Sequence, residues 1–458
     1  MGRSLVRGNV GRAERFARPG NSYGPGMAES RVSRASQSQS QQAVARTLRA
    51  PRVPPPRSRA GRVVGDSGIA GVVAALPPYP GSGGEQGGSV RRPRVIELRL
   101  SAYANHRRGV YRLGPVTLFS GRSGSGKSSA LRAYAALSRL GGGSAVREVF
   151  TDVAECVPVW ARADGEGRRG FRIGCTADGP EGPVALDVAV QAEPRMRIVG
   201  ERLRAGGTVL LETALRDPAR PYVDAAWHTG GSTARMRAPF PDDQLGTALL
   251  PLRVSGRTDA QRRVIAAAEQ MVVALRSVFF CDPDPDAMRV PVRPGSGRLM
   301  TGCDNFADVV FRTRAECALR HAALVVAVDA GCAGPVVDLR AEALADGRLH
   351  AVLDRGGGIT ALPRLGDGEL RHLGLALALL TGPGVLTVDA PRELPTPFNA
   401  LTVLADNFDS HLDLRQRYAL LELAVLMAER GHLRLLGTSP DASWAHGAGG
   451  VTVVHLDG

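Results

Sequence analysis

Hydrophobic positions recur along most of the chain in two spacings, and together they predict a mixed α/β fold. Short runs of alternating or continuous apolar residues, typical of strands, cover 95–100, 116–119, 171–175, 184–190, 196–199, 209–212, 349–353, 401–405, 433–436 and 451–454. Apolar residues at helical spacing cover 128–137, 259–278, 305–325, 372–380 and 414–430. Strands and helices alternate near both ends of this region, whereas residues from about 145 to 240 are mostly strand.

Residues 1–92 differ in composition from the rest of the chain. They are rich in glycine, proline, serine, glutamine and arginine, with a Ser/Gln repeat at 36–42 and consecutive prolines at 54–56. A segment of this composition buries too little apolar surface to offset the entropy of ordering its backbone. We therefore predict a disordered N-terminal tail over 1–92.

The formal net charge of +14 belongs almost entirely to the same part of the chain. Residues 1–94 contain 16 arginines and 4 acidic residues, whereas the remaining residues contain 42 basic and 40 acidic ones. Arginines in a flexible segment attract the phosphates of nucleic acids, so nucleic acid is one candidate partner of the tail. An unselected extension of the chain is the alternative, which we favour.

The sequence lacks features that are typical of membrane-spanning and secreted proteins. No apolar run of about 18 residues is present, so no membrane-spanning helix is expected, and no N-terminal stretch resembles a signal peptide. The six cysteines are widely spaced and include no C-x-x-C pair, which is typical of reduced thiols in a cytoplasm. We therefore expect a cytoplasmic protein without contact to a membrane.

One stretch carries a phosphate-binding motif in a fitting context. Residues 121–128 read Gly-Arg-Ser-Gly-Ser-Gly-Lys-Ser, the P-loop (Walker A) spacing G-x-x-x-x-G-K-[ST], between a predicted strand and a predicted helix. Lys127 is the only lysine among the 58 Lys and Arg residues. A compact ammonium fits between phosphate oxygens where a planar guanidinium does not. The residues expected to bind the nucleotide are Gly121, Ser123, Gly124, Ser125, Gly126, Lys127, Ser128 and Ser129, with Ser128 also binding Mg²⁺.

Further candidate stretches stand at the boundaries of predicted elements. Residues 365–369, Leu-Gly-Asp-Gly-Glu, precede the helix of 372–380. Asp406 follows the strand of 401–405 and begins the run Asp-Asn-Phe-Asp-Ser-His-Leu-Asp. Tyr103, which lies 24 residues before Lys127, could stack on an adenine base or be an ordinary core or surface residue.

Together these stretches resemble the ATP-binding cassette (ABC) class of P-loop ATPases. The resemblance covers about 95–140 and 345–458 and is nearer to the chromosome-maintenance, recombination-repair and overcoming-lysogenisation-defect branch than to transporters. It implies ATP and Mg²⁺ as ligands and a homodimer that forms around ATP. It also implies an α/β P-loop NTPase fold of ABC-ATPase type with an inserted α+β domain. The expected parts are an N-terminal ATPase part (93–145), an inserted β-rich then helical region (146–345) and a C-terminal ATPase part (346–458).

The resemblance assigns roles to residues at the ends of the predicted strands. Asp406 would bind Mg²⁺ together with Ser128. Asn407 stands where the family has the glutamate that polarises the attacking water, and Thr438 stands where it has a histidine. Asn407 can orient a water but cannot accept its proton, so the resemblance implies slow ATP hydrolysis.

Two details of the resemblance leave alternatives. Gly366 and Gly368 would belong to the signature that contacts the γ-phosphate of ATP bound by the opposite protomer, with Gly366 in the place of a serine. A competing alignment uses Asp389 in place of Asp406, with Ala390 where the glutamate would be.

Three functions therefore stay open at this point. The first is a slow ABC-type ATPase or ATP-gated switch that acts on DNA or in a defence or repair system. The second is a P-loop kinase or phosphotransferase, which would leave 365–369 and 406–413 unexplained. The third is a nucleotide-binding scaffold that does not hydrolyse ATP.

Overall fold

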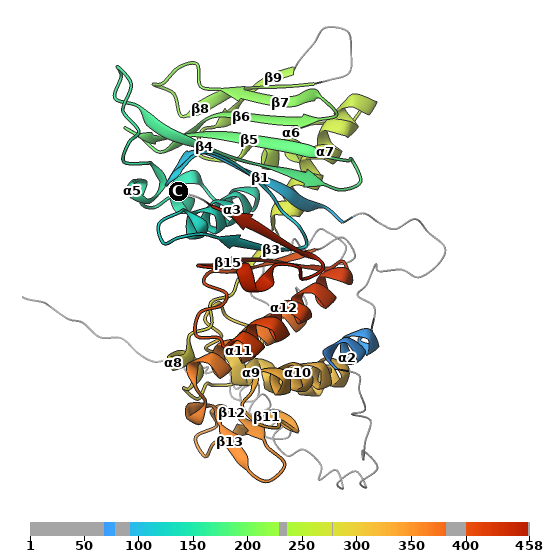
Figure 1. Ribbon diagram of the computed structural model, residues 1–458. Helices are drawn as coiled ribbons and strands as arrows, with labels where there is room; N and C mark the ends of the chain where they lie inside the picture. The colour runs from blue at the N-terminus through green and yellow to red at the C-terminus, as the bar shows by residue number, and fades with distance from the viewer. Residues whose placement is uncertain (1–67, 78–91, 229–235, 277, 382–399, 457–458) are drawn as a thin grey trace, which may run out of the picture. The chain divides into compact units, whose positions relative to one another are not determined.

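The computed structural model describes residues 68–77, 92–228, 236–276, 278–381 and 400–456. Within these residues, three sheets and the helices between them form the fold (Figure 1). The prediction of a mixed α/β protein built on a strand, P-loop and helix is confirmed. None of the described helices is both long and apolar enough to cross a membrane.

A parallel sheet carries the P-loop. Its five strands lie in the order β10 (Val278–Phe280), β14 (Leu401–Ala405), β15 (Leu433–Ser439), β3 (Val116–Ser120) and β16 (Val451–His455). Every residue of β3, β14 and β15 is buried. Because a parallel sheet is covered on both faces, its strands read as continuous apolar runs rather than alternating ones, as the sequence does here.

An antiparallel sheet of eight strands begins with the two strands before the P-loop. The strands lie in the order β2 (His106–Arg112), β1 (Arg94–Tyr103), β4 (Arg169–Asp178), β5 (Val184–Glu193), β6 (Arg197–Ala205), β7 (Thr208–Ala214), β8 (Tyr222–Trp227) and β9 (Met236–Pro241). Because β1 pairs with β4, the sheet crosses the predicted boundary between 145 and 146. The strands of the expected insert thus extend a sheet of the N-terminal part and do not form one of their own.

Helices cover one face of this antiparallel sheet and join it to the parallel sheet. They are α3 (Lys127–Gly141), α4 (Val146–Val149), α5 (Val153–Cys156), α6 (Gly246–Arg253) and α7 (Asp259–Arg276). Both α3 and α7 contact β1 and β4, and α3 also contacts β15 of the parallel sheet. Arg434 of β15 strengthens this junction, because its guanidinium donates to the carbonyl oxygens of Val95, Leu113 and Gly114.

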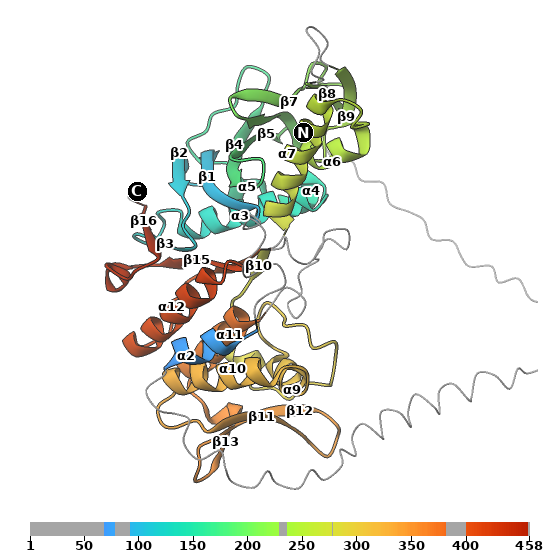
Figure 2. The same ribbon diagram turned by 90° about the vertical axis from the view of Figure 1, so that its right-hand side faces the viewer.

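The other face of the parallel sheet is covered by a helical layer. It contains α8 (Pro285–Met288), α9 (Phe306–Glu316), α10 (Ala318–Gly331), α11 (Asp367–Leu380) and α12 (Leu414–Glu429), with a small sheet of β11 (Asp338–Ala343), β12 (Leu349–Asp354) and β13 (Ile359–Ala361) (Figure 2). The single helix predicted over 305–325 is wrong. It is two helices, because Cys317 has an extended backbone (φ −149°, ψ 88°) that ends α9 and precedes α10.

Two hydrophobic cores lie on the two sides of the parallel sheet. Leu118 of β3 and Leu435 of β15 belong to the core of the helical layer, whereas their neighbours Phe119 and Leu436 belong to the core under the antiparallel sheet. Successive residues of a strand point to opposite faces, so each strand contributes to both cores. The P-loop strand is thereby held between two packed layers.

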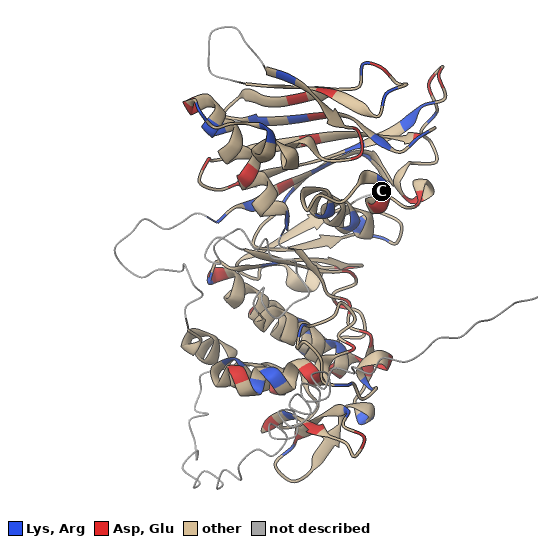
Figure 3. Ribbon diagram, turned by 180° about the vertical axis from the view of Figure 1, so that it is seen from behind, with Lys and Arg blue, Asp and Glu red and all other residues tan. Residues whose placement is uncertain are grey.

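A short helix lies within the segment expected to be a disordered tail. Of that segment only residues 68–77 and 92 are among those described, and there α2 (Ile69–Ala75) packs against α10 and α12. Ile69 and Val73 are buried, and Arg430 donates to the carbonyl oxygen of Val73. The expectation of disorder is therefore wrong for this stretch, because its apolar residues at helical spacing bury against the helical layer. Basic and acidic residues are interspersed over the described elements (Figure 3).

Candidate functional site

The candidate site lies at the carboxyl end of the parallel sheet. The P-loop leaves β3 there, β15 ends in Thr438 and Ser439, and Asp406 follows β14. Ligands of open α/β sheets bind outside the carboxyl ends of the strands. The strand order therefore brings three stretches together that lie far apart in the sequence.

The P-loop has a backbone conformation that requires glycine. Gly121 (φ 152°) and Gly126 (φ 98°) adopt angles that residues with side chains rarely take. A Cβ at Gly121 would also overlap the carbonyl oxygen of Leu456, and one at Gly126 would lie 2.7 Å from Nε2 of His106. Both glycines of the motif are therefore required by the packing of the loop.

Polar donors of the loop are available to an anion. The Nζ of Lys127 donates to the carbonyl oxygens of Gly121 (2.6 Å) and Arg122 (2.8 Å), so the ammonium is held over the loop, and no carboxylate among the described residues pairs with it. The Oγ of Ser125 is buried and has no hydrogen-bond partner among the described residues. The first N–H groups of α3 also lack partners within the helix. This set of ammonium, hydroxyl and amide donors fits the oxygens of a phosphate chain.

Asp406 contacts the P-loop directly. The Oγ of Ser128 donates to Oδ1 of Asp406 at 3.0 Å, and Oγ1 of Thr438 donates to the same oxygen at 2.5 Å. Hydroxyl and carboxylate oxygens are the ligands that Mg²⁺ prefers, so Ser128 and Asp406 fit the cation that accompanies a nucleotide. The competing candidate, Asp389, and its neighbour Ala390 lie outside the described residues.

The hydroxyl of Thr438 holds neighbouring residues in position through two hydrogen bonds. Thr438 is fully buried, and its Oγ1 accepts a hydrogen bond from the backbone N–H of Asn407 (2.7 Å) while donating to Asp406. A side chain so engaged orients the stretch that follows β14. Its hydroxyl is thus engaged by Asn407 and Asp406, at the position where the resemblance places a histidine.

Asn407 lies at the surface of the site. Its side chain is exposed, and its backbone adopts the left-handed region (φ 47°) that asparagine tolerates better than most residues. Its carbonyl oxygen accepts a hydrogen bond from Arg371 (3.3 Å), which also contacts Asp282 and the carbonyl of Pro283. Arg371 thus joins α11 to the strand ends of β10 and β14, and nothing in the sequence pattern pointed to it.

The signature-like stretch forms the start of α11. Gly366 is exposed and caps the helix, with Glu369 accepting from its N–H (3.4 Å). Gly368 packs so closely on the backbone of His411 that a Cβ would overlap its carbonyl oxygen. The stretch therefore adjoins the loop after Asp406, but no hydrogen bond between described residues joins it to the P-loop.

His106, the first residue of β2, supports the P-loop, a role that sequence reasoning missed. Its Nε2 lies 3.1 Å from the carbonyl oxygen of Gly126, and its Nδ1 lies 2.8 Å from the hydroxyl of Tyr111. A carbonyl can only accept, so Nε2 carries the proton and Nδ1 accepts from Tyr111. Burial lowers the pKa of His106, which keeps the ring neutral. Asn105 adds a hydrogen bond to the carbonyl of Gly124 (2.7 Å).

The candidate aromatic residue Tyr103 is part of the core. It is 4% exposed and packs edge-on against Phe150 and Phe171, so it cannot stack on a base. The aromatic ring of Trp160, by contrast, is exposed. Trp160 is 44% exposed, and the guanidinium of Arg107, next to His106, lies 5.0 Å from the centre of its ring.

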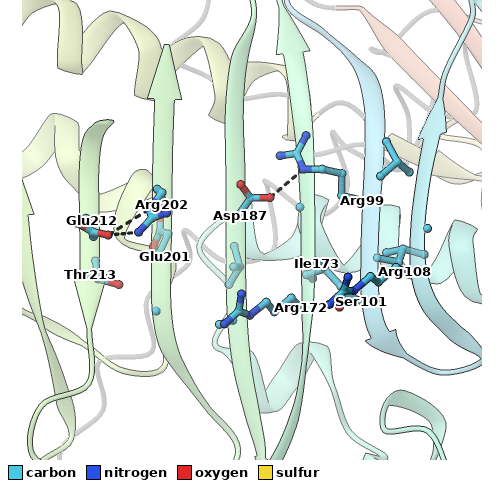
Figure 4. Close-up of a pocket in the computed structure, with 17 residues that line it drawn as sticks. Arg99, Ser101, Arg108, Arg172, Ile173, Asp187, Glu201, Arg202, Glu212 and Thr213 are labelled. Carbon is cyan, nitrogen blue, oxygen red and sulfur yellow. Dashed lines mark hydrogen bonds and ion pairs between the residues drawn. The ribbon is translucent and has the colours of Figure 1, made fainter. Parts of the chain in front are cut away.

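A second hollow, of about 600 Å³, lies on the face of the antiparallel sheet away from α3 and α7 (Figure 4). Cross-strand ion pairs occupy much of it, including Arg99 with Asp187 (2.9 Å) and Arg202 with Glu212. Arg108 and Arg172 also line it, and neither has an ion pair among the described residues. The hollow contains none of the residues that the sequence singled out.

Comparison with known proteins yields likenesses among solved structures. No family model and no curated protein matches the chain. Among solved structures, an Smc head bound to the C-winged helix domain of ScpA is 12% identical with a TM-score of 0.40, covering 77% of this chain and 91% of that chain. The SMC head domain from Thermotoga maritima is 11% identical with a TM-score of 0.36, covering 76% and 89%. An Smc head from Pyrococcus furiosus with an extended coiled coil, bound to the C-terminal domain of ScpA, is 11% identical with a TM-score of 0.34, covering 76% and 90%. At these values, the function must be argued from the chain's own residues.

Proposed function

We propose that this chain binds ATP with Mg²⁺ at the P-loop and hydrolyses it slowly. The observation that carries the proposal is the direct contact between Ser128 of the P-loop and Asp406 at the end of β14. The two residues are separated by 278 positions in the sequence, yet they present two oxygen ligands beside a loop of phosphate donors. That combination supports a nucleoside phosphate bound with a divalent cation.

Each residue of the site would have a separate task. Lys127 and the amides of the loop would bind the β- and γ-phosphates, and Ser128 and Asp406 would hold the cation. Bound Mg²⁺ would neutralise phosphate charge as it develops. Thr438 would keep Asp406 in place through its 2.5 Å hydrogen bond.

Slow hydrolysis follows from the residue after Asp406. The exposed side chain of Asn407 can donate and accept hydrogen bonds to orient a water, but an amide does not take up a proton at neutral pH. General-base catalysis contributes on the order of 10²–10⁴-fold to a rate. Without it, the protein would spend most of its time in the ATP-bound state, as an ATP-gated switch requires.

The exposed start of α11 supports dimerisation on ATP. Gly366 is exposed with open space around it, and no hydrogen bond between described residues joins the start of α11 to the P-loop of the same chain. Amides at a helix N-terminus bind anions, so a second copy could offer them the γ-phosphate. Action on nucleic acid draws its support from the arginines of 1–94, since the described elements mix both signs of charge (Figure 3).

The proposal is tested by single-turnover hydrolysis of Mg²⁺-ATP. Asn407→Glu would supply a proton acceptor and Asn407→Gln would not, while both bear a similar cost of about 1–2 kcal/mol at a left-handed position. We expect slow phosphate release by the native chain and a rate at least about tenfold higher for Asn407→Glu than for Asn407→Gln. Equal rates would contradict the role of Asn407. Bound but unhydrolysed ATP in all three proteins would favour the non-hydrolysing scaffold.

A further inference from the structure

Two histidines face each other at the same end of the parallel sheet, on the far side of β3 from Asp406. His455 is the last residue of β16, and His446 follows the 3₁₀ turn η3 (Ser443–Ala445). Both side chains are exposed, and their Nε2 atoms lie 3.3 Å apart. The ring centres are 5.4 Å apart, with the planes at 62°. The ring centres lie farther apart than the two Nε2 atoms, by about the width of one ring. The two Nε2 atoms therefore point toward each other.

This separation suits a shared metal ion. Zinc binds imidazole nitrogens at about 2.0–2.1 Å in tetrahedral geometry, which places two such nitrogens about 3.3–3.4 Å apart. A neutral pair could instead share one N–H···N hydrogen bond, for which 3.3 Å is a long distance. Two protonated rings would repel each other. The arrangement is therefore more favourable for a bridging cation than for the free side chains.

The segments that carry the two rings are anchored to one residue. His455 is in register with Ser120 of β3, and the N–H of Leu456 donates to the carbonyl oxygen of Ser120 (2.7 Å). On the other side, the N–H of Ala442 donates to Oγ of Ser120 (3.0 Å). Since both segments are fixed before any ion binds, little ordering entropy opposes binding.

A carboxylate lies close to the pair. Hydrogen bonds from Ser443 are the main cause that lowers the pKa of Asp441, and the charges of His446 and His455 lower it further. Asp441 thus contributes negative potential to the site. No group of three or more His, Cys, Asp and Glu side chains among the described residues is placed to hold a metal, so solvent would complete the coordination.

We propose that His446 and His455 bind a divalent transition-metal ion of the zinc class. Imidazole suits Zn²⁺, Ni²⁺ and Cu²⁺, whereas the oxygen ligands Ser128 and Asp406 suit Mg²⁺. The site is thus chemically distinct from the cation site at the P-loop. It does not depend on the proposed ATPase activity.

The test is calorimetric titration of the full chain with Zn²⁺ in the absence of nucleotide. We expect one site that weakens at least about tenfold in His446→Ala and in His455→Ala, because two imidazoles held together act at high effective concentration. His350→Ala is the matched control, since His350 lies near Glu342 and is not paired with another histidine of the described ranges. Unchanged Zn²⁺ binding in both variants, or none in the native chain, would overturn the proposal.

A second measurement separates ligand loss from damage to the fold. Because both rings are exposed, His446→Ala and His455→Ala should keep the native circular dichroism spectrum and melting temperature without metal. Excess Mg²⁺ should leave Zn²⁺ binding unchanged, and Ni²⁺ should compete with it. Displacement of Zn²⁺ by Mg²⁺ would place the ion at oxygen ligands and contradict the assignment.

Discussion

Single residues decide whether the site can select a nucleotide rather than phosphate alone. Arg107 and Trp160 form an exposed stacked pair, and Arg107 is adjacent to His106, which contacts the P-loop. The N–H of Ala104 in the same turn donates to the carbonyl of Cys156, a few residues before Trp160. We therefore place the base of the proposed nucleotide against this pair, in the role that buried Tyr103 cannot fill.

Replacing Trp160 should weaken the binding of ATP more than that of inorganic tripolyphosphate. Stacking on an aromatic ring is worth about 0.5–1.5 kcal/mol, so Trp160→Ala should raise the Kd for ATP about 2–10-fold. Trp227→Ala is the control, since its ring in β8 stacks on Phe240 of β9, at the edge of the antiparallel sheet farthest from β1 and β2. An equal effect of Trp160→Ala on ATP and tripolyphosphate would rule out a contact to the base.

At the scale of elements, the junction between the two larger sheets depends on Arg434. It is 5% exposed, and its guanidinium donates to three carbonyl oxygens and has no carboxylate partner within the described part of the chain. A lysine has one compact head group and cannot reach all three. Leaving buried carbonyls without donors costs about 1–3 kcal/mol.

We expect Arg434→Lys to lower the free energy of unfolding by about 2 kcal/mol, measured by urea denaturation. Arg202→Lys is the matched control, because Arg202 is half exposed and pairs with Glu212 at the sheet surface. Its effect should stay within about 0.5 kcal/mol. Equal losses in the two variants would mean that Arg434 is not a special link between the sheets.

Much of the fold was predictable from the sequence at this scale, and the misses have physical causes. The buried strands 116–119, 401–405 and 433–436 were found because both faces are apolar. The break at Cys317 was missed because apolar spacing continues across it, although its backbone leaves the helix. The continuity of the eight-stranded sheet across residues 145 and 146 was not foreseen, because the pairing of β1 with β4 leaves no local signal in the sequence.

Some residues of the candidate site were likewise found from the sequence, and others were missed. Ser128 and Asp406 were paired in advance because the resemblance to ABC-type ATPases assigns both residues to Mg²⁺, and the two side chains are in hydrogen-bond contact. His106 and Arg371 were not found, since each acts through contacts with backbone groups far away in the sequence. Contacts of this kind leave no recognisable motif in the sequence.

At the scale of the whole molecule, the proposed ATP-bound dimer makes a separate prediction. Gly366 has open space around its Cα, so Gly366→Arg should fold normally but block a partner at the start of α11. Gly357→Arg is the control, because Gly357 also has open space and lies in a turn between β12 and β13. In light scattering with Mg²⁺-ATP, we expect dimers of the native chain and of Gly357→Arg, and monomers of Gly366→Arg. Dimers of all three would contradict this interface.

The most direct test of the account is equilibrium binding of ATP to the full chain with Mg²⁺. Lys127→Ala removes the ammonium, and Lys127→Arg keeps the charge but replaces it with a planar group like the other 57 basic residues. Hydrogen bonds to charged groups are worth about 1.5–3 kcal/mol, so we predict that both changes weaken ATP binding about 10–100-fold. Native affinity in both variants, or no ATP binding by the native chain, would contradict the central claim that this P-loop is a nucleotide site.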